Sequence, residues 1–225
     1  MKNSRLLWHW LSVSLVSLML LATNVSAQST WDAIKDRGSI RVEVTEAPPW
    51  FSKNPATGEW GGLGSAIGKQ MAKEMDVEFE PVEVTWSTAV AALQANKIDV
   101  MFVLDATPKR ALAINFPAQP LLYYALAILA DYDLNIKSWE DLNKSGAKIS
   151  VIQGTTMDTY VSARLNKAEI LRFPSNGESV AAFQPGRVNV VSLFHPPLIA
   201  MRKKIGWGQN VLPSPIRQSA SSAGV

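Results

Sequence analysis

The chain of 225 residues contains no cysteine and only two histidines, His9 and His195. The absence of cysteine excludes disulfide bonds, cysteine-ligated zinc, iron–sulfur clusters and thiol catalysis. The shortage of histidine excludes metal motifs built from histidine pairs, and no G-x-S-x-G segment is present to supply the serine of a catalytic triad. These shortages narrow the chemistry open to the chain, and we expect no metal and no cofactor; the main hypothesis below also assigns no catalytic residue.

Residues 1–27 have the features of a secretory signal peptide. Lys2 and Arg5 form a basic head, residues 6–22 are apolar, and small residues at 25–27 predict cleavage after Ala27. A transmembrane anchor is the alternative, but the apolar run is at the short limit for a span and a cleavage motif follows it. No cysteine follows for lipid attachment. We expect a periplasmic protein that is not a lipoprotein.

The net charge of +3 largely reflects that first segment. The segment holds two of the 22 basic residues and none of the 19 acidic ones, so the mature chain has 20 basic against 19 acidic residues, a net charge of +1. This near balance argues against a nucleic-acid partner.

The mature sequence alternates short β-rich runs with helical ones, which predicts an α/β fold with mostly parallel sheets. A long apolar run at 121–130 leaves the first unit, after which the alternation restarts. The pattern predicts two α/β units joined at 127–133. Strands are expected at 40–45, 77–84, 98–103, 148–152, 170–173 and 188–193, and helices at 63–75, 87–96, 155–165 and 178–183.

The segment after the third strand indicates an anion site. Thr107 is a suitable N-cap and Pro108 suits the first helical position, so that a helix with free backbone N–H groups is expected to begin here. Arg110 follows in the same turn, and its guanidinium can bind a carboxylate through two hydrogen bonds. The alternative is a surface arginine paired with a neighbouring acid.

A second candidate lies in the other unit, where Gly154 and Thr155 follow a strand and open a helix. Glycine lets a ligand approach the backbone, and threonine caps the helix. An ordinary capped loop is the alternative. Two such helix starts, one in each unit, predict a small ligand held between two domains.

Several segments, in this order, resemble the family 3 solute-binding proteins, the periplasmic receptors of polar amino-acid ABC importers. They are 38–42 (GSIRV), 48–50 (PPW), Trp86, 92–100 (ALQANKIDV), 107–110 (TPKR), 114–116 (INF), 141–142 (DL), 153–156 (QGTT) and 186–188 (GRV).

The resemblance implies a type II periplasmic-binding fold, with two lobes that close over a ligand by a hinge motion. It implies lobe 1 at 28–126, a hinge crossover at 127–133, lobe 2 at 134–216, and at 217–225 the start of a return strand to lobe 1. Helices that complete lobe 1 would normally follow, so we expect a C-terminally truncated chain with exposed apolar surface on that lobe.

The resemblance also implies roles for individual residues. Arg110 would hold the α-carboxylate of the ligand, Thr155 would assist from lobe 2, and Trp86 would pack on the ligand side chain. The partners implied are a small amino acid or carboxylate and a membrane ABC permease, and we expect a monomer.

The chain departs from the family pattern where the ligand's ammonium group is expected to bind. The usual carboxylates are missing from residues 62–66. Residues 194–197 (FHPP) stand where many amino-acid binders carry an aspartate for the α-amino group, and Asn189 replaces the aspartate of the family's G-R-x-D. A buried ammonium needs a carboxylate or several acceptors. Asp105 or Glu46 takes this role, or the ligand is not an ordinary α-amino acid; we favour Asp105. As an alternative, Asp105 pairs with Arg110 or caps the same helix.

Two aromatic residues and one histidine complete the candidates. Trp50, after two prolines, either lines the ligand cleft or packs under its loop, and Phe194 stands near the end of the last strand. His195 lies between Phe194 and Pro196, which favours a structural turn over catalysis.

The main hypothesis is a non-enzymatic receptor that delivers a carboxylate-bearing solute, most simply an amino acid, to a permease. One rival is an enzyme on the same scaffold, similar to the cyclohexadienyl dehydratases, with Asp105, Glu46 or His195 as acid or base. The other is a non-functional truncated remnant.

Overall fold

The computed structural model describes residues 29–225, and the signal peptide predicted at 1–27 lies outside the described residues. The chain from Ile34 to Val225 forms one compact unit. Within the described residues, none of the helices combines the length and the apolar character needed to span a membrane.

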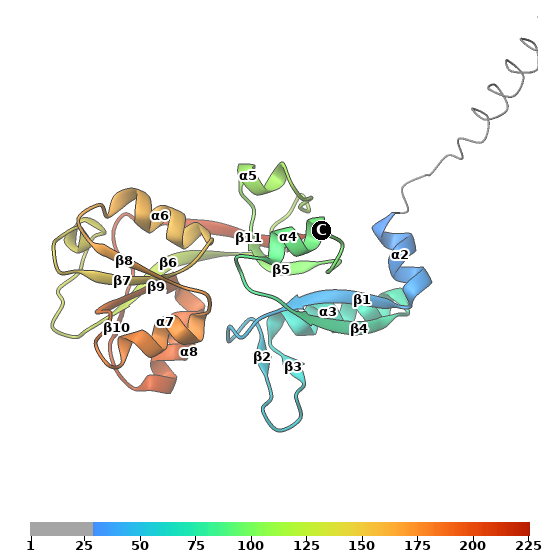
Figure 1. The fold of residues 1–225 in the computed structure, drawn as a ribbon, viewed down its shortest axis with the longest axis horizontal. Helices are drawn as coiled ribbons and strands as arrows, with labels where there is room; N and C mark the ends of the chain where they lie inside the picture. The colour runs from blue at the N-terminus through green and yellow to red at the C-terminus, as the bar shows by residue number, and fades with distance from the viewer. Residues whose placement is uncertain (1–28) are drawn as a thin grey trace, which may run out of the picture. The chain divides into compact units, whose positions relative to one another are not determined.

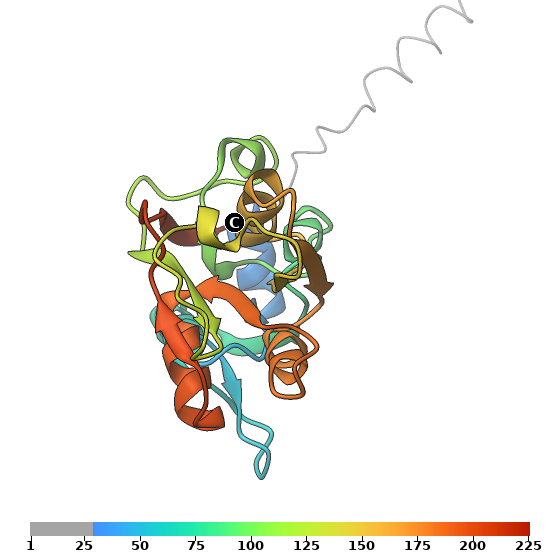
Figure 2. The same cartoon turned by 90° about the vertical axis from the view of Figure 1, so that its left-hand side faces the viewer.

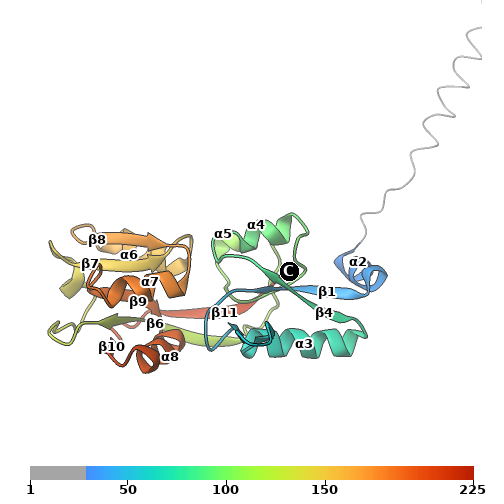
Figure 3. The ribbon, with the colours of Figure 1, turned by 60° about the horizontal axis from the view of Figure 1, so that its bottom comes forward.

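The first lobe begins with a two-stranded parallel sheet covered by a helix. Strand β1 (Ser39–Val44) pairs in register with β4 (Glu78–Glu83), and α3 (Leu63–Met75) packs against both (Figure 3). Gly68 of α3 lies so close to the sheet that a Cβ there would come within 2.9 Å of the Phe79 ring and 3.1 Å of Val42. The small residue therefore sets how closely the helix packs on the sheet.

A second, larger sheet runs through both lobes. Its strand order is β5 (Met101–Asp105), β11 (Gln218–Gly224), β6 (Leu122–Ala130), β9 (Val190–Phe194), β7 (Lys148–Ile152) and β8 (Glu169–Phe173) (Figure 1). A seventh strand, β10 (Gln209–Val211), pairs antiparallel with β6. Strands β6 and β11 thus join the two lobes.

Strand β6 changes partner in its middle. Residues 122–125 pair with β11, whereas residues 126–130 pair with β9. The change falls just before the crossover predicted at 127–133. The apolar run contains no glycine or proline to end the strand, so the connection between the lobes is a continuous strand.

The second lobe has helices on both sides of its strands (Figure 2). β7 pairs in parallel with β8 and with β9, as the alternating pattern predicted. Helices α6 (Thr156–Arg164), α7 (Asn176–Phe183) and α8 (His195–Ile205) pack on these strands and on β6. The α/β, two-lobed fold predicted from the sequence is confirmed, with antiparallel pairings at β6, β10 and β11 added. The remaining elements are α2 (Thr30–Arg37), β2 (Ser52–Lys53), β3 (Trp60–Gly61), α4 (Ala89–Gln94), α5 (Pro108–Ala111) and the short 3₁₀ helix η1 (Glu140–Leu142).

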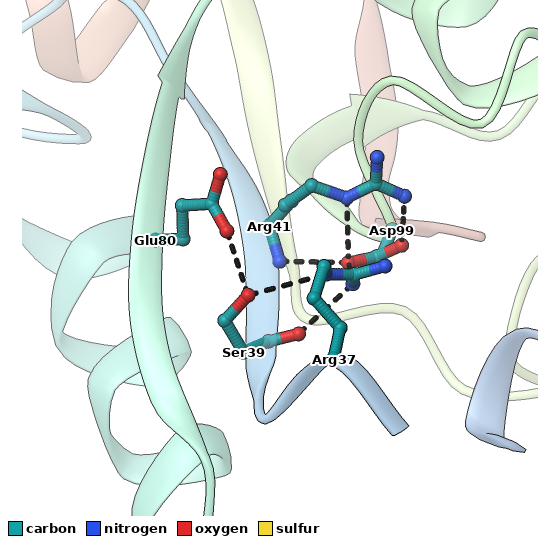
Figure 4. Close-up of polar contacts among 5 residues, drawn as sticks. All are labelled: Arg37, Ser39, Arg41, Glu80 and Asp99. Atoms are coloured by element: carbon teal, nitrogen blue, oxygen red, sulfur yellow. Dashed lines mark hydrogen bonds and ion pairs between the residues drawn. The ribbon is translucent and has the colours of Figure 1, made fainter. Parts of the chain in front are cut away.

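A buried carboxylate fastens β1 to the segment that enters β5. Asp99, 5% exposed, accepts hydrogen bonds from the Arg41 backbone N–H at 2.7 Å and from the Arg41 guanidinium at 2.6 Å (Figure 4). The Arg37 guanidinium donates to the same carboxylate. Ser39, also on β1, donates to Glu80 of β4 at 2.7 Å. These contacts connect the two sheets of lobe 1 by charge-assisted hydrogen bonds.

Candidate functional site

A small cavity of about 40 Å³ lies between the two lobes. Its wall carries one guanidinium and one carboxylate, and the other lining side chains are uncharged and mostly apolar. Six of the nine predicted ligand-binding residues line it. The lining residues are Trp50, Trp86, Val103, Leu104, Asp105, Arg110 and Tyr124 from lobe 1 and β6, and Thr155, Thr156, Met157, Asn176, Leu193, Phe194 and Pro197 from lobe 2.

The cation of the cavity is Arg110. Thr107 caps α5 as predicted, accepting the Arg110 backbone N–H at 3.2 Å, and the guanidinium donates to the Asp105 carbonyl oxygen at 3.0 Å. Burial lowers the pKa of Arg110, an effect partly offset by the nearby Asp105 charge. Among the described residues, no carboxylate lies within 4.0 Å of this guanidinium. Arg110 can therefore bind an external anion.

The helix dipole adds little to this site. α5 contains only four residues, one turn, whereas the macrodipole sums over several aligned turns. The guanidinium, rather than the helix start, provides the positive charge.

The anion of the cavity is Asp105, which is 4% exposed. Its carboxylate accepts the Tyr124 hydroxyl at 2.7 Å and also the hydroxyl of Thr156 from lobe 2. The carboxylate neither caps α5 nor forms an ion pair with Arg110, so both alternatives considered from the sequence are wrong. Its two hydroxyl donors offset part of the cost of burying a charge.

An irregularity in β5 precedes Asp105. The pairing with β11 shifts register between Ser222 and Gly224, and Val103 has φ +60°. A β-branched residue rarely adopts this conformation, and such strain persists only where the surrounding structure enforces it. Bulges change the direction of the residues that follow them, here Leu104 and Asp105, which both line the cavity.

Aromatic rings form one wall of the cavity. The Tyr124 ring lies 3.9 Å from Phe194 and 6.0 Å from Trp50, measured between centroids. Burial, followed by the Asp105 charge, raises the pKa of Tyr124 well above its ordinary value, so the hydroxyl keeps its proton and donates. Tyr124 was absent from the sequence candidates. The only signal was a tyrosine inside an apolar run, since a buried phenol requires a hydrogen-bond partner.

The predicted anion site at the start of α6 is already occupied by a carboxylate of the same helix. Asp158 accepts the Gly154 backbone N–H at 3.4 Å and pairs with Arg172 at 2.9 Å. Thr155 caps the helix by accepting the Asp158 N–H at 3.3 Å and donates to the Ile152 carbonyl at 2.7 Å. The α6 N-terminus therefore lines the cavity through Thr155 and Thr156 without offering a free anion site.

Three predicted residues lie outside the cavity lining. Thr107 serves as the cap of α5. Gly154 instead approaches lobe 1, because a Cβ at this position would lie 3.2 Å from the Ser87 Cβ. Glu46 accepts the Lys53 backbone N–H at 2.9 Å and lines a separate cavity beside α7 and α8. Glu46 therefore does not line the cavity that contains Arg110 and Asp105, because a position near a strand end does not fix the side on which the loop leaves.

The remaining candidates for chemistry are also accounted for. His195 is the first residue of α8 and does not line the cavity. Over residues 29–225, no group of three or more acidic or histidine side chains is arranged to hold a metal ion.

Known proteins match this chain in sequence, and solved structures match its fold. The chain is 28% identical over 185 residues to the glutamine-binding protein GlnH of a Bacillus subtilis ABC transporter, covering 80% of this chain and 67% of that protein. It is 30% identical over 151 residues to the lysine/arginine/ornithine-binding periplasmic protein of Escherichia coli, covering 66% of this chain and 56% of that protein.

Among solved structures, an ancestral amino acid-binding protein described as a precursor of cyclohexadienyl dehydratase matches with a TM-score of 0.80 and 30% identity, covering 88% of this chain and 86% of that one. The cysteine-binding protein of Campylobacter jejuni matches with a TM-score of 0.81 and 26% identity, covering 88% and 80%. The family model of the bacterial extracellular solute-binding proteins, family 3, matches residues 40–204, more than half of the chain. With this match and the two-lobed fold around a charged cavity, the chain belongs to the bacterial extracellular solute-binding proteins of family 3.

Proposed function

We propose that this protein binds an amino acid between its lobes and delivers it to the membrane permease of an ABC importer. The observation that carries the proposal is the presence of one partly buried guanidinium and one buried carboxylate in a cavity that is otherwise uncharged. A zwitterionic amino acid offers the complementary pair of charges. Relatives whose names specify amino acids support this substrate class.

Each charged side chain has a separate role in this proposal. Arg110 binds the α-carboxylate, for which its planar fork is suited. Asp105 binds the α-ammonium, which takes the place of the Thr156 hydroxyl as a donor to the Asp105 carboxylate. Trp50, Trp86 and Phe194 line the apolar part, and Thr155 contributes from lobe 2.

The setting of the protein follows from the same proposal. The signal peptide at 1–27 directs export, with cleavage after Ala27 and no lipid anchor, so that the protein acts in the periplasm as a monomer. We retain lobe 1 at 28–126 and lobe 2 at 134–216 as the domains, with the crossover at 127–133 and the return segment at 217–225. The lobes close over the ligand by bending of the strands that connect them.

Binding without turnover is the better interpretation of the cavity. Of the three acid or base candidates, only Asp105 lines it, and both Asp105 oxygens already accept hydrogen bonds from hydroxyl groups. Glu46 and His195 lie elsewhere. A dehydratase would consume a prephenate-like substrate, and an absorbance assay for loss of that substrate tests the alternative.

The direct test is titration calorimetry with the twenty common amino acids and Arg110→Ala. The variant should bind the best ligand about 30-fold more weakly, the equivalent of about 2 kcal/mol for a lost charge-assisted pair. Lys109→Ala is the matched control, because Lys109 is the exposed neighbour on the same helical turn. Unchanged affinity in Arg110→Ala would remove the basis of the site.

A further inference from the structure

One polar side chain of the cavity has no partner. Asn176 lines the cavity, is 2% exposed, and its Oδ1 has no hydrogen-bond partner among the described residues. A buried polar atom left unpaired is costly, so buried amides in folded proteins nearly always find a partner. Two threonines of lobe 2 also line the wall, and both of their hydroxyl groups already have acceptors. Thr155 donates to the Ile152 carbonyl and Thr156 donates to the Asp105 carboxylate.

Asn176 has no evident task in holding its own helix. It is the first residue of α7, and the capping role belongs to Ser175. The Ser175 hydroxyl accepts the Glu178 backbone N–H at 3.2 Å and donates to the Glu178 carboxylate at 3.2 Å. The α7 start is therefore complete without the Asn176 amide, whose oxygen remains unpaired in a residue that lines the cavity.

The charges of the cavity limit what can meet this amide. Arg110 and Asp105 are matched by the carboxylate and ammonium that every amino acid carries, and no third charged residue lines the wall. A cationic or anionic ligand side chain would be buried without a counter-charge, at a large cost. An uncharged side chain with an N–H or O–H group would instead donate to Asn176 Oδ1.

We infer that the ligand is an amino acid with an uncharged side chain that ends in a hydrogen-bond donor, an amide or a hydroxyl, and that Asn176 is the residue that recognises it. The inference rests on the proposed function and specifies its substrate class. Sites that hydrogen-bond a substrate group discriminate strongly against analogues that lack it, because the protein group is then left unpaired.

The experiment measures by calorimetry the affinities of the purified protein and of Asn176→Leu for six amino acids: glutamine, asparagine, serine, alanine, lysine and arginine. In the unaltered protein, at least one of glutamine, asparagine and serine should bind more tightly than alanine and at least tenfold more tightly than lysine or arginine. Asn176→Leu should bind that ligand about tenfold more weakly, which is the effect of losing one neutral hydrogen bond. Its affinity for alanine should stay the same.

A second variant covers the case in which leucine disturbs the fold. Asn176→Asp keeps the shape and places an acid in the first turn of α7, where it suits the helix. Asn176→Asp should bind lysine or arginine at least tenfold more tightly than the unaltered protein does. Asn166→Asp, at an exposed asparagine outside the cavity, is the matched control and should change none of the six affinities.

The outcomes separate this inference from the proposed function. Binding of lysine or arginine as tight as that of the uncharged ligands, or equal loss of alanine and the polar ligand in Asn176→Leu, overturns the role of Asn176 while amino-acid binding stands. If the protein binds none of the amino acids, with or without Arg110→Ala, both the proposed function and the role of Asn176 are overturned.

Discussion

The hydroxyl of Tyr124 donates a hydrogen bond of 2.7 Å to Oδ1 of Asp105, and both residues are buried. Tyr124 lies on β6 and Asp105 on β5, two strands separated in the sheet by β11. The Thr156 hydroxyl approaches the other carboxylate oxygen from lobe 2. One Asp105 oxygen is therefore bound by Tyr124 of the same sheet, and the other is bound by Thr156 of the opposite lobe. In the proposed opening of the lobes, only the Thr156 contact has to break.

Replacing Tyr124 by phenylalanine tests the contact within the sheet. Tyr124→Phe retains the ring and its packing but leaves a buried carboxylate oxygen without that donor. Hydrogen bonds to charged groups contribute more than neutral ones, so the free energy of unfolding should fall by about 2 kcal/mol. Urea denaturation at pH 7 measures the change.

The neighbouring tyrosine provides the control for this substitution. Tyr123 is 69% exposed on the same strand, and Tyr123→Phe should leave the free energy of unfolding unchanged within about 0.5 kcal/mol. Equal stability of the two variants would mean that the Tyr124–Asp105 bond contributes nothing.

The sequence predicted those parts of the fold that depend on neighbouring residues. Thr107 and Thr155 were expected to cap helices and do so, since each cap acts within three residues. The strands of β1, β4 and β7 followed from local patterns. The pairing of β6 with β11 joins segments about a hundred residues apart, and no local pattern encodes the point at which β6 changes partner.

The cavity shows the same division between local and distant information. Arg110 and Asp105 were singled out from one short segment, and both line the cavity. Tyr124 and Asn176 were missed, because their importance depends on which strand or helix faces the space between the lobes. Glu46 lines a different cavity, beside α7 and α8, and a local pattern cannot tell the two apart.

A buried carboxyl in lobe 1 makes stability depend on pH. Glu43 of β1 is fully buried, neither of its oxygens has a partner among the described residues, and desolvation raises its pKa from 4.5 to about 8. Well below pH 4.5 the group is protonated in both states, so it makes no contribution to the pH dependence of stability. Between pH 4.5 and 8 the unfolded chain ionises while the folded chain does not, so stability falls as the pH rises.

Glu43→Gln imitates the protonated form and should remove this pH dependence. The variant and the unaltered protein should have similar free energies of unfolding at pH 4.5, and the variant should be more stable at pH 8.5 by roughly 4 kcal/mol. Urea denaturation across this pH range measures the difference. Glu78→Gln, at an exposed carboxyl on β4, should follow the unaltered protein throughout. A constant offset between Glu43→Gln and the unaltered protein at every pH would contradict the raised pKa.

Asp99, Arg37 and Arg41 form a cluster, the Asp99 cluster, that should contribute more to the free energy of unfolding than an exposed ion pair does. Asp99→Asn keeps the size of the side chain but removes the charge that binds Arg37 and Arg41. Loss of a buried partner leaves these charges poorly compensated, although both arginines retain 20–30% side-chain exposure and recover part of their hydration. The free energy of unfolding should fall by about 3 kcal/mol.

An exposed ion pair of the same lobe serves as the comparison. Lys53 and Glu83 lie 3.3 Å apart with side chains 47% and 64% exposed, and Glu83→Gln should change the free energy of unfolding by less than about 0.5 kcal/mol. If Asp99→Asn were as mild as Glu83→Gln, the cluster would not hold the two sheets together.

The approach of the lobes to each other can be tested at Gly154. This residue has φ +75°, and a Cβ there would lie 3.2 Å from the Ser87 Cβ in lobe 1. Gly186 has almost the same backbone conformation, φ +74°, but a Cβ there would meet nothing within 4 Å. Alanine at either position should cost about 1 kcal/mol of stability from the left-handed backbone alone. Only Gly154→Ala should also obstruct the close contact of the two lobes.

Ligand affinity separates these two effects. Because the proposed binding requires the lobes to close, Gly154→Ala should weaken amino-acid binding severalfold in calorimetry, whereas Gly186→Ala should leave it unchanged. Small-angle scattering with saturating amino acid should show a larger radius of gyration for Gly154→Ala than for Gly186→Ala. Equal affinities in the two variants would show that Ser87 gives way at little cost and that the Gly154 contact does not control closure.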